Sequence, residues 1–170
     1  MERARIWLPP VLIITAIVLQ STLLQRLSIA DVVPDISLIL LIFFANRQGC
    51  MQGQISGFAS GLVQDFLSTA PLGFYAFIRT ITGFLYGLTK GKFFVDPILL
   101  PIILVVVGTL FKTLFTGILG LFFIPPESME PVFGQKLWIE LGFNALISPF
   151  LFGLLKVFKV FKVRNTGGFS

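Results

Sequence analysis

The chain contains no histidine and a single cysteine, Cys50, among its 170 residues. One cysteine cannot form a disulfide within the chain. The usual zinc sites need several histidine or cysteine ligands, so they are excluded. Nucleophilic catalysis by a Ser-His-Asp or Cys-His arrangement is also excluded, because no histidine is available as the base. The sequence therefore predicts no metal, no cofactor and no enzymatic activity.

Charged residues are scarce as well. Only 12% of the residues are charged and 55% are hydrophobic, and the mean hydropathy is +0.93. A soluble domain carries roughly a quarter charged residues, so this chain has too little polar surface to cover a globule in water. The lipid bilayer is the expected solvent. The formal net charge is +5, but the basic residues are scattered through hydrophobic sequence, which favours an anionic membrane surface over nucleic acid as partner.

Six hydrophobic stretches are candidates for membrane-spanning helices, each of which needs about 20 mostly apolar residues. We expect a single transmembrane domain over residues 1–170, an all-α integral membrane protein with six helices in one bundle. The second stretch is short, and Pro34 and Asp35 indicate a kinked or re-entrant start at the membrane interface. The expected spans are residues 6–24, 32–45, 52–67, 73–88, 97–124 and 137–158.

Basic residues set the expected orientation, because Lys and Arg are retained on the cytoplasmic side. If both termini are cytoplasmic, the inner segments hold nine basic residues and the outer segments two, while Arg79 and Lys112 lie within spans. We therefore expect a multi-pass membrane protein with cytoplasmic termini, and Asp35 then lies on the outer side. The nine inner residues are Arg3, Arg5, Arg47, Lys90, Lys92, Lys156, Lys159, Lys162 and Arg164, and the two outer residues are Arg26 and Lys136.

Three glycines, Gly53, Gly57 and Gly61, are spaced four residues apart in the third expected span. Positions four apart lie on nearly one face of a helix, so these glycines form a groove without side chains. In lipid, such a face lets two helix backbones approach closely. Two interpretations stay open, namely ordinary packing within this protein and a seam for a partner helix.

Asp65 continues the glycine face, and Arg79 lies in the next expected span. A carboxylate within a span usually faces the bundle and has a partner. Arg79 is six residues from Gly73, or about 9 Å along a helix at 1.5 Å per residue, which matches the expected depth of Asp65. We therefore expect a buried Asp65–Arg79 ion pair. An ion or proton pathway is the alternative, and Lys112 is expected to pair or to snorkel.

The segments PDISLILLIFFANRQG and GQISGFASGLVQDFLSTAPLGFYAFIRTITGFLYG resemble the MreD family, small rod shape-determining membrane proteins of bacteria. The resemblance covers roughly residues 34–87. The resemblance rests on the order in which the motif positions follow one another, since a GxxxG motif alone recurs widely in membrane helices. The matching positions are Pro34, Asp35 and Leu38, then Gly57, Phe58, Gly61, Leu62 and Asp65, then Leu72, Gly73 and Gly83.

The resemblance implies a non-catalytic part of the machinery that builds peptidoglycan in elongating rod-shaped cells, located in the bacterial inner membrane. It implies MreC as main partner, with MreB, the RodA glycosyltransferase and its transpeptidase partner. It also implies a fold similar to the substrate-binding subunits of energy-coupling-factor vitamin transporters. Vitamin binding is the alternative function, although the chain has only two tryptophans, Trp7 and Trp138, and few polar groups to hold a vitamin. Whether copies of the chain form a homo-oligomer stays open.

Overall fold

The computed structural model describes residues 2–22, 32–91, 99–123 and 134–157 of the chain. In these ranges the regular structure is α-helical, so the all-α fold is confirmed for this part of the chain. Each helix overlaps one of the six expected hydrophobic stretches. The helices are α1 (Glu2–Thr22), α2 (Ile36–Gln48), α3 (Cys50–Leu67), α4 (Phe74–Leu88), α5 (Leu99–Phe123) and α6 (Gln135–Val157).

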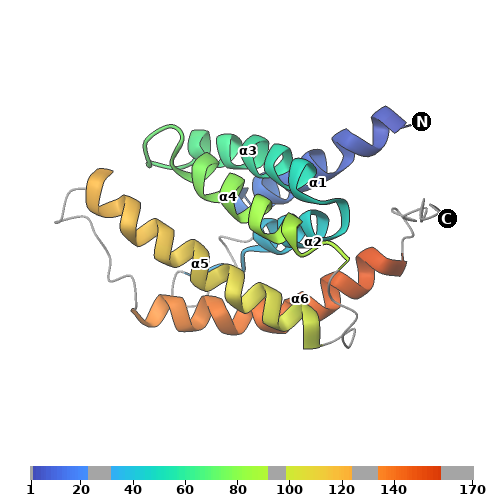
Figure 1. The fold of residues 1–170 in the computed structure, drawn as a ribbon. Helices are drawn as coiled ribbons and strands as arrows, with labels where there is room; N and C mark the ends of the chain where they lie inside the picture. The colour runs from blue at the N-terminus through green and yellow to red at the C-terminus, as the bar shows by residue number, and fades with distance from the viewer. Residues whose placement is uncertain (1, 23–31, 92–98, 124–133, 158–170) are drawn as a thin grey trace.

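The helix α2 forms the centre of the fold (Figure 1). It packs against each of the other five described helices, and its residues from Ser37 to Ala45 are all buried. A helix that is apolar on every side has to be enclosed by protein or lipid. This position explains why the second hydrophobic stretch is short. Because α2 lies inside the bundle, its length need not match the thickness of a bilayer.

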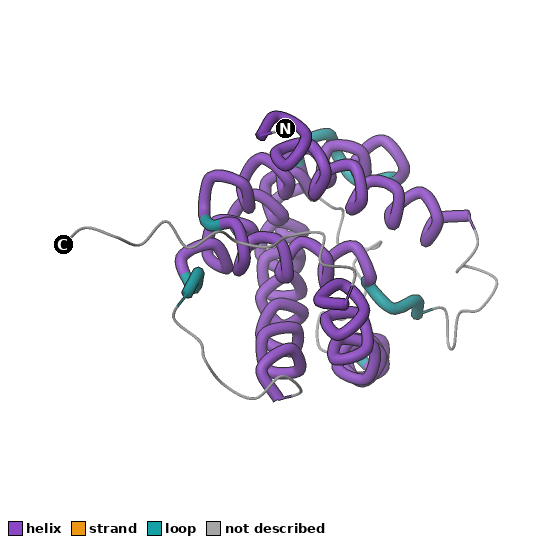
Figure 2. Tube along the Cα trace, turned by 90° about the vertical axis from the view of Figure 1, so that its right-hand side faces the viewer, coloured by secondary structure: helices purple, strands orange, loops and turns teal. Residues whose placement is uncertain are grey.

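The other helices form two groups around α2. Figure 1 shows α3 and α4 side by side, with α1 next to them, and α5 and α6 paired along the opposite side of the molecule. Figure 2 shows from a second direction that helices make up most of the described chain and that the described loops are short. The two groups meet across the beginning of α2, where the polar side chains described below gather.

Two of the described helices are long and apolar enough to cross a membrane, α5 over Leu99–Phe123 and α6 over Gln135–Leu155. Only 28% of the apolar window of each is buried inside the molecule. Large apolar side chains such as Phe122, Leu146 and Phe150 are exposed on them. Apolar surface on this scale is normal in lipid and abnormal in water. The crossing of a bilayer by all six helices stays a prediction.

Candidate functional site

Asp35 caps the buried start of α2. Its carboxylate oxygen Oδ1 accepts hydrogen bonds from the backbone N–H of Leu38 at 3.0 Å and from the hydroxyl of Ser37 at 2.7 Å. The first N–H groups of a helix have no partner within the helix, and an aspartate at the N-cap supplies one. The Pro34-Asp35 motif therefore sets where α2 begins, at Ile36 and not at residue 32 as expected.

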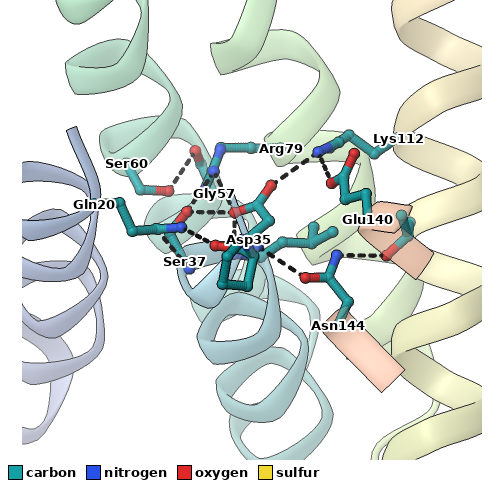
Figure 3. Close-up of polar contacts among 12 residues, drawn as sticks. Gln20, Asp35, Ser37, Gly57, Ser60, Arg79, Lys112, Glu140 and Asn144 are labelled. Atoms are coloured by element: carbon teal, nitrogen blue, oxygen red, sulfur yellow. Dashed lines mark hydrogen bonds and ion pairs between the residues drawn. The ribbon is translucent and has the colours of Figure 1, made fainter. Parts of the chain in front are cut away.

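Two basic side chains from other helices reach the same carboxylate (Figure 3). Nη2 of Arg79, from α4, lies 3.4 Å from Oδ1 of Asp35 and donates to the Ser37 hydroxyl at 2.6 Å. Nζ of Lys112, from α5, lies 3.0 Å from Oδ2 of Asp35 and also pairs with Glu140 of α6. The cluster thus contains two acids and two bases, and its formal charges balance.

Neutral side chains complete the contacts of this segment. Oδ1 of Asn144, from α6, accepts from the backbone N–H of Asp35 at 2.8 Å, and its amide donates to Thr109 of α5 at 3.0 Å. Gln20, from α1, accepts from the backbone N–H of Ser37 at 3.1 Å and donates to the carbonyl of Pro34. We call the whole set the Asp35 hub, and its members are Gln20, Asp35, Ser37, Arg79, Lys112, Glu140 and Asn144 (Figure 3).

The hub corrects two expectations about charge. Asp35 is not at an exposed helix end, because it is buried inside the bundle and meets Lys112 close to the midpoint of α5. The ion-pair partner of Arg79 in the described chain is Asp35, not Asp65. Depth was estimated from the sequence by counting residues from the start of each span, which assumes that every span begins at the membrane surface. That assumption fails for α2, which begins inside the bundle.

Asp65 has a different role, at the junction between α3 and α4. Its carboxylate accepts hydrogen bonds from three backbone N–H groups, those of Gly73 at 2.9 Å, Tyr75 at 2.7 Å and Ala76 at 3.2 Å. The start of a helix carries partial positive charge and unpaired N–H groups, so a carboxylate is favourable there. Gly73 has a φ of 95°, in the left-handed region where glycine is favoured, and this turn brings α4 back onto Asp65.

The three glycines of α3 form a seam against α4, which we call the glycine seam. A Cβ atom at Gly53, Gly57 or Gly61 would overlap the backbone of α4, at Gly83, Arg79 and Tyr75–Ala76 respectively. At Gly57, for example, it would lie 2.7 Å from the carbonyl carbon of Arg79. The packing is therefore internal, which agrees with the first of the two interpretations. A partner helix could not occupy the same face.

The remaining motif residues lie apart from the hub. Phe58 and Leu72 are exposed, at 54% and 69%, and Leu62 is half-buried. The other positions of the MreD-like motif have three structural roles: they cap α2, let α3 approach α4 closely, and form the start of α4.

Sequence reasoning missed three members of the hub, Gln20, Ser37 and Asn144. The signal for Asn144 was a polar amide inside an apolar run, which in lipid needs a hydrogen-bond partner.

The charges of the hub are compensated within the hub itself. Its charged groups bind one another, and among the described residues no group of three or more His, Cys, Asp or Glu side chains is placed to hold a metal ion. In an apolar interior such mutual pairing keeps helices in one arrangement, because separating the charges is costly.

Comparison with known proteins gave one finding. A family model described as MreD, rod shape-determining protein MreD, matches residues 1–158. No curated protein and no solved structure matched the chain.

Proposed function

This chain belongs to the MreD family of rod shape-determining proteins, and from that premise we propose that it is a non-catalytic membrane component of the bacterial cell-elongation machinery. Its role is to bind MreC and so to help position peptidoglycan synthesis along the cell. MreB, RodA and the transpeptidase that works with RodA are the further members of the assembly. The observation that carries this proposal is the family match, which extends over nearly the whole chain.

The architecture supports a scaffold role. The interior of the bundle is occupied by α2 and by side chains that pair with one another, and the seam between α3 and α4 is closed by backbone contact. A scaffold needs a fixed outer shape, and these contacts fix it. Because α4 already fills the glycine seam, MreC is expected to bind on another surface of the molecule.

The first experiment tests the cellular role. The chain is expressed in a rod-shaped bacterium depleted of its own MreD, and cell shape is recorded by microscopy. We expect the chain to restore rods, and a Gly57→Leu variant, which cannot close the seam, to leave cells round. Round cells that carry the wild-type chain in the membrane at normal abundance would contradict the proposal.

The second experiment tests the partner. A tagged copy of the chain is purified in mild detergent from cells that also produce the MreC of the same organism. We expect MreC to co-purify with the wild-type chain and with a Gly142→Ala control, since Gly142 has open space around it. If the chain restores cell shape but does not co-purify with MreC, the role in cell shape is supported and the proposal that MreC is the partner is contradicted.

A further inference from the structure

A second face of α3 carries polar side chains that neither the family motif nor the glycine seam uses. Gln52, Ser56, Ser60 and Gln64 are spaced four residues apart, so they share one face of the helix, which we call the polar stripe. At 1.5 Å per residue, the stripe extends about 18 Å along α3. Ser56 and Ser60 are 1% and 0% exposed, so the middle of the stripe is sealed from lipid and from bulk solvent.

Several polar atoms along the stripe have no hydrogen-bond partner among the described residues. They are Oε1 of Gln52, Oγ of Ser56 and Oε1 of Gln64, all buried. Nη1 of Arg79, in the neighbouring hub, is a fourth such atom, and Arg79 is only 3% exposed. Buried polar atoms are nearly always paired with protein or with ordered water. Inside a membrane protein an unpaired group is especially costly, because lipid offers no partner.

The stripe and Arg79 lie in the same region. Gly57, between Ser56 and Ser60 in the sequence of α3, packs against the backbone of Arg79. Figure 3 draws Ser60, Gly57 and Arg79 together, and the Ser60 hydroxyl donates to the Gly57 carbonyl at 3.1 Å. Ligands along the stripe would find acceptors in the glutamine amides at its two ends and a donor in Nη1 of Arg79.

The chemistry of these atoms selects the ligand. The hub has two acids and two bases and hence no excess charge to attract an ion. The unpaired atoms include an N–H donor, carbonyl acceptors and a hydroxyl that can do both, so the ligand must donate and accept. Water meets both requirements and is the usual occupant of buried polar sites.

We propose that a file of internal water molecules lies along the polar stripe and leads from Gln52 to the Arg79 guanidinium group. The water supplies the missing partners of the stripe and solvates the charged form of Arg79 inside the bundle. This water site is independent of the proposed role in cell shape. The water molecules would hydrate the hub at the place where the helices meet.

The test measures how fast water reaches the stripe in the full chain in lipid vesicles. Each variant carries one thiol, in a Cys50→Ser background, and S–H to S–D exchange in D2O is followed by infrared spectroscopy. Ser56→Cys and Ser60→Cys place the thiol in the stripe, while Val105→Cys is a matched control in the apolar core with 0% exposure. We expect both stripe thiols to exchange at least about tenfold faster than the control, because exchange needs contact with water.

A second measurement needs no substitution. Transfer of magnetisation from water to backbone amides is recorded by solid-state NMR of the wild-type chain in lipid. Amides of Ser56 and Gln64 are expected to receive it much faster than those of Leu41 and Ile42, which lie in the apolar core. Stripe thiols that exchange as slowly as the Val105→Cys thiol, or stripe amides as slow as those of α2, would overturn the proposal.

Discussion

Asp35 and Asp65 are both buried carboxylates, at 9% and 2% exposure, but different kinds of group bind their oxygens. Asp35 faces two full positive charges, from Arg79 and Lys112. Asp65 faces three backbone N–H groups at the start of α4. The first arrangement joins helices that are distant in sequence, whereas the second fixes a local turn. Substitutions at the two positions should therefore have different consequences.

Asp65 provides a prediction about the turn. Asp65→Ala removes every acceptor for the three N–H groups and should lower the free energy of unfolding by about 0.5–2 kcal/mol, as the loss of a helix cap does. Asp65→Asn keeps one acceptor oxygen and should cost less. Unfolding in mixed detergent micelles measures both. An Asn variant as unstable as the Ala variant would indicate that the negative charge matters and not the cap.

Sequence reasoning identified Asp65 and Arg79 as buried charges, but it identified neither their partners nor the burial of Asp35. Asp65 and Arg79 were both expected to be buried, and they are, yet each has partners other than those expected. Hydropathy shows which residues lie in apolar stretches, but it does not give the depth of a short internal helix. The position of Asp35 depends on α2 starting inside the bundle, which follows from tertiary packing and not from local pattern.

At the scale of the element, the glycine seam between α3 and α4 is a close helix contact whose cause is visible in the sequence. The spacing of four residues predicted a bare face, and the structure places the backbone of α4 against it. The sequence could not say whether the second helix came from this chain or from a partner. The bounds of α3 and α4 lie within two residues of the expected ones, whereas α1 begins four residues earlier and α2 four residues later than expected.

Two glycine-to-alanine substitutions test the seam against a matched control. Gly57→Ala inserts a methyl group against the Arg79 carbonyl and should destabilise by about 1–3 kcal/mol, as overpacking does. Gly142 lies in α6, and nothing lies within 4 Å of the point that an added methyl group would occupy there. Gly142→Ala should therefore stabilise slightly, by about 0.5–1 kcal/mol from helix propensity. The measurement is the free energy of unfolding of each variant. Equal changes in the free energy of unfolding of the two variants would mean that the methyl group added at Gly57 does not contact α4.

At the scale of the whole molecule, the distribution of basic residues predicts that both termini are cytoplasmic. A reporter active only outside the cytoplasm, fused after Ser170, should be silent, and the same reporter inserted near Ser128 should be active. Both positions lie in segments outside the described residues. The physical reason is the retention of Lys and Arg on the inner side. A reporter that is active after Ser170 and silent near Ser128 would show that the C-terminus lies outside the cytoplasm, contrary to the prediction.

The Asp35 hub is one of the contacts that join the two groups of helices, together with the apolar core. It joins α1, α2 and α4 to α5 and α6 through side chains whose charges balance. Removing one member of a buried pair typically costs about 3–5 kcal/mol, because the other charge is left unpaired. Asp35→Ala leaves both Arg79 and Lys112 without this partner. It should therefore be the most damaging of the substitutions considered, for stability and for rescue of rod shape.

A pair of double-mutant cycles tests this account most directly. Free energies of unfolding are measured for Asp35→Ala, Arg79→Ala and the double variant, and then for the same cycle with Asp65→Ala in place of Asp35→Ala. The account predicts a coupling energy of about 0.5–3 kcal/mol between Asp35 and Arg79, as for residues in one salt-bridge network, and a much smaller one between Asp65 and Arg79. The opposite ranking, with Arg79 coupled to Asp65 and independent of Asp35, would contradict the hub.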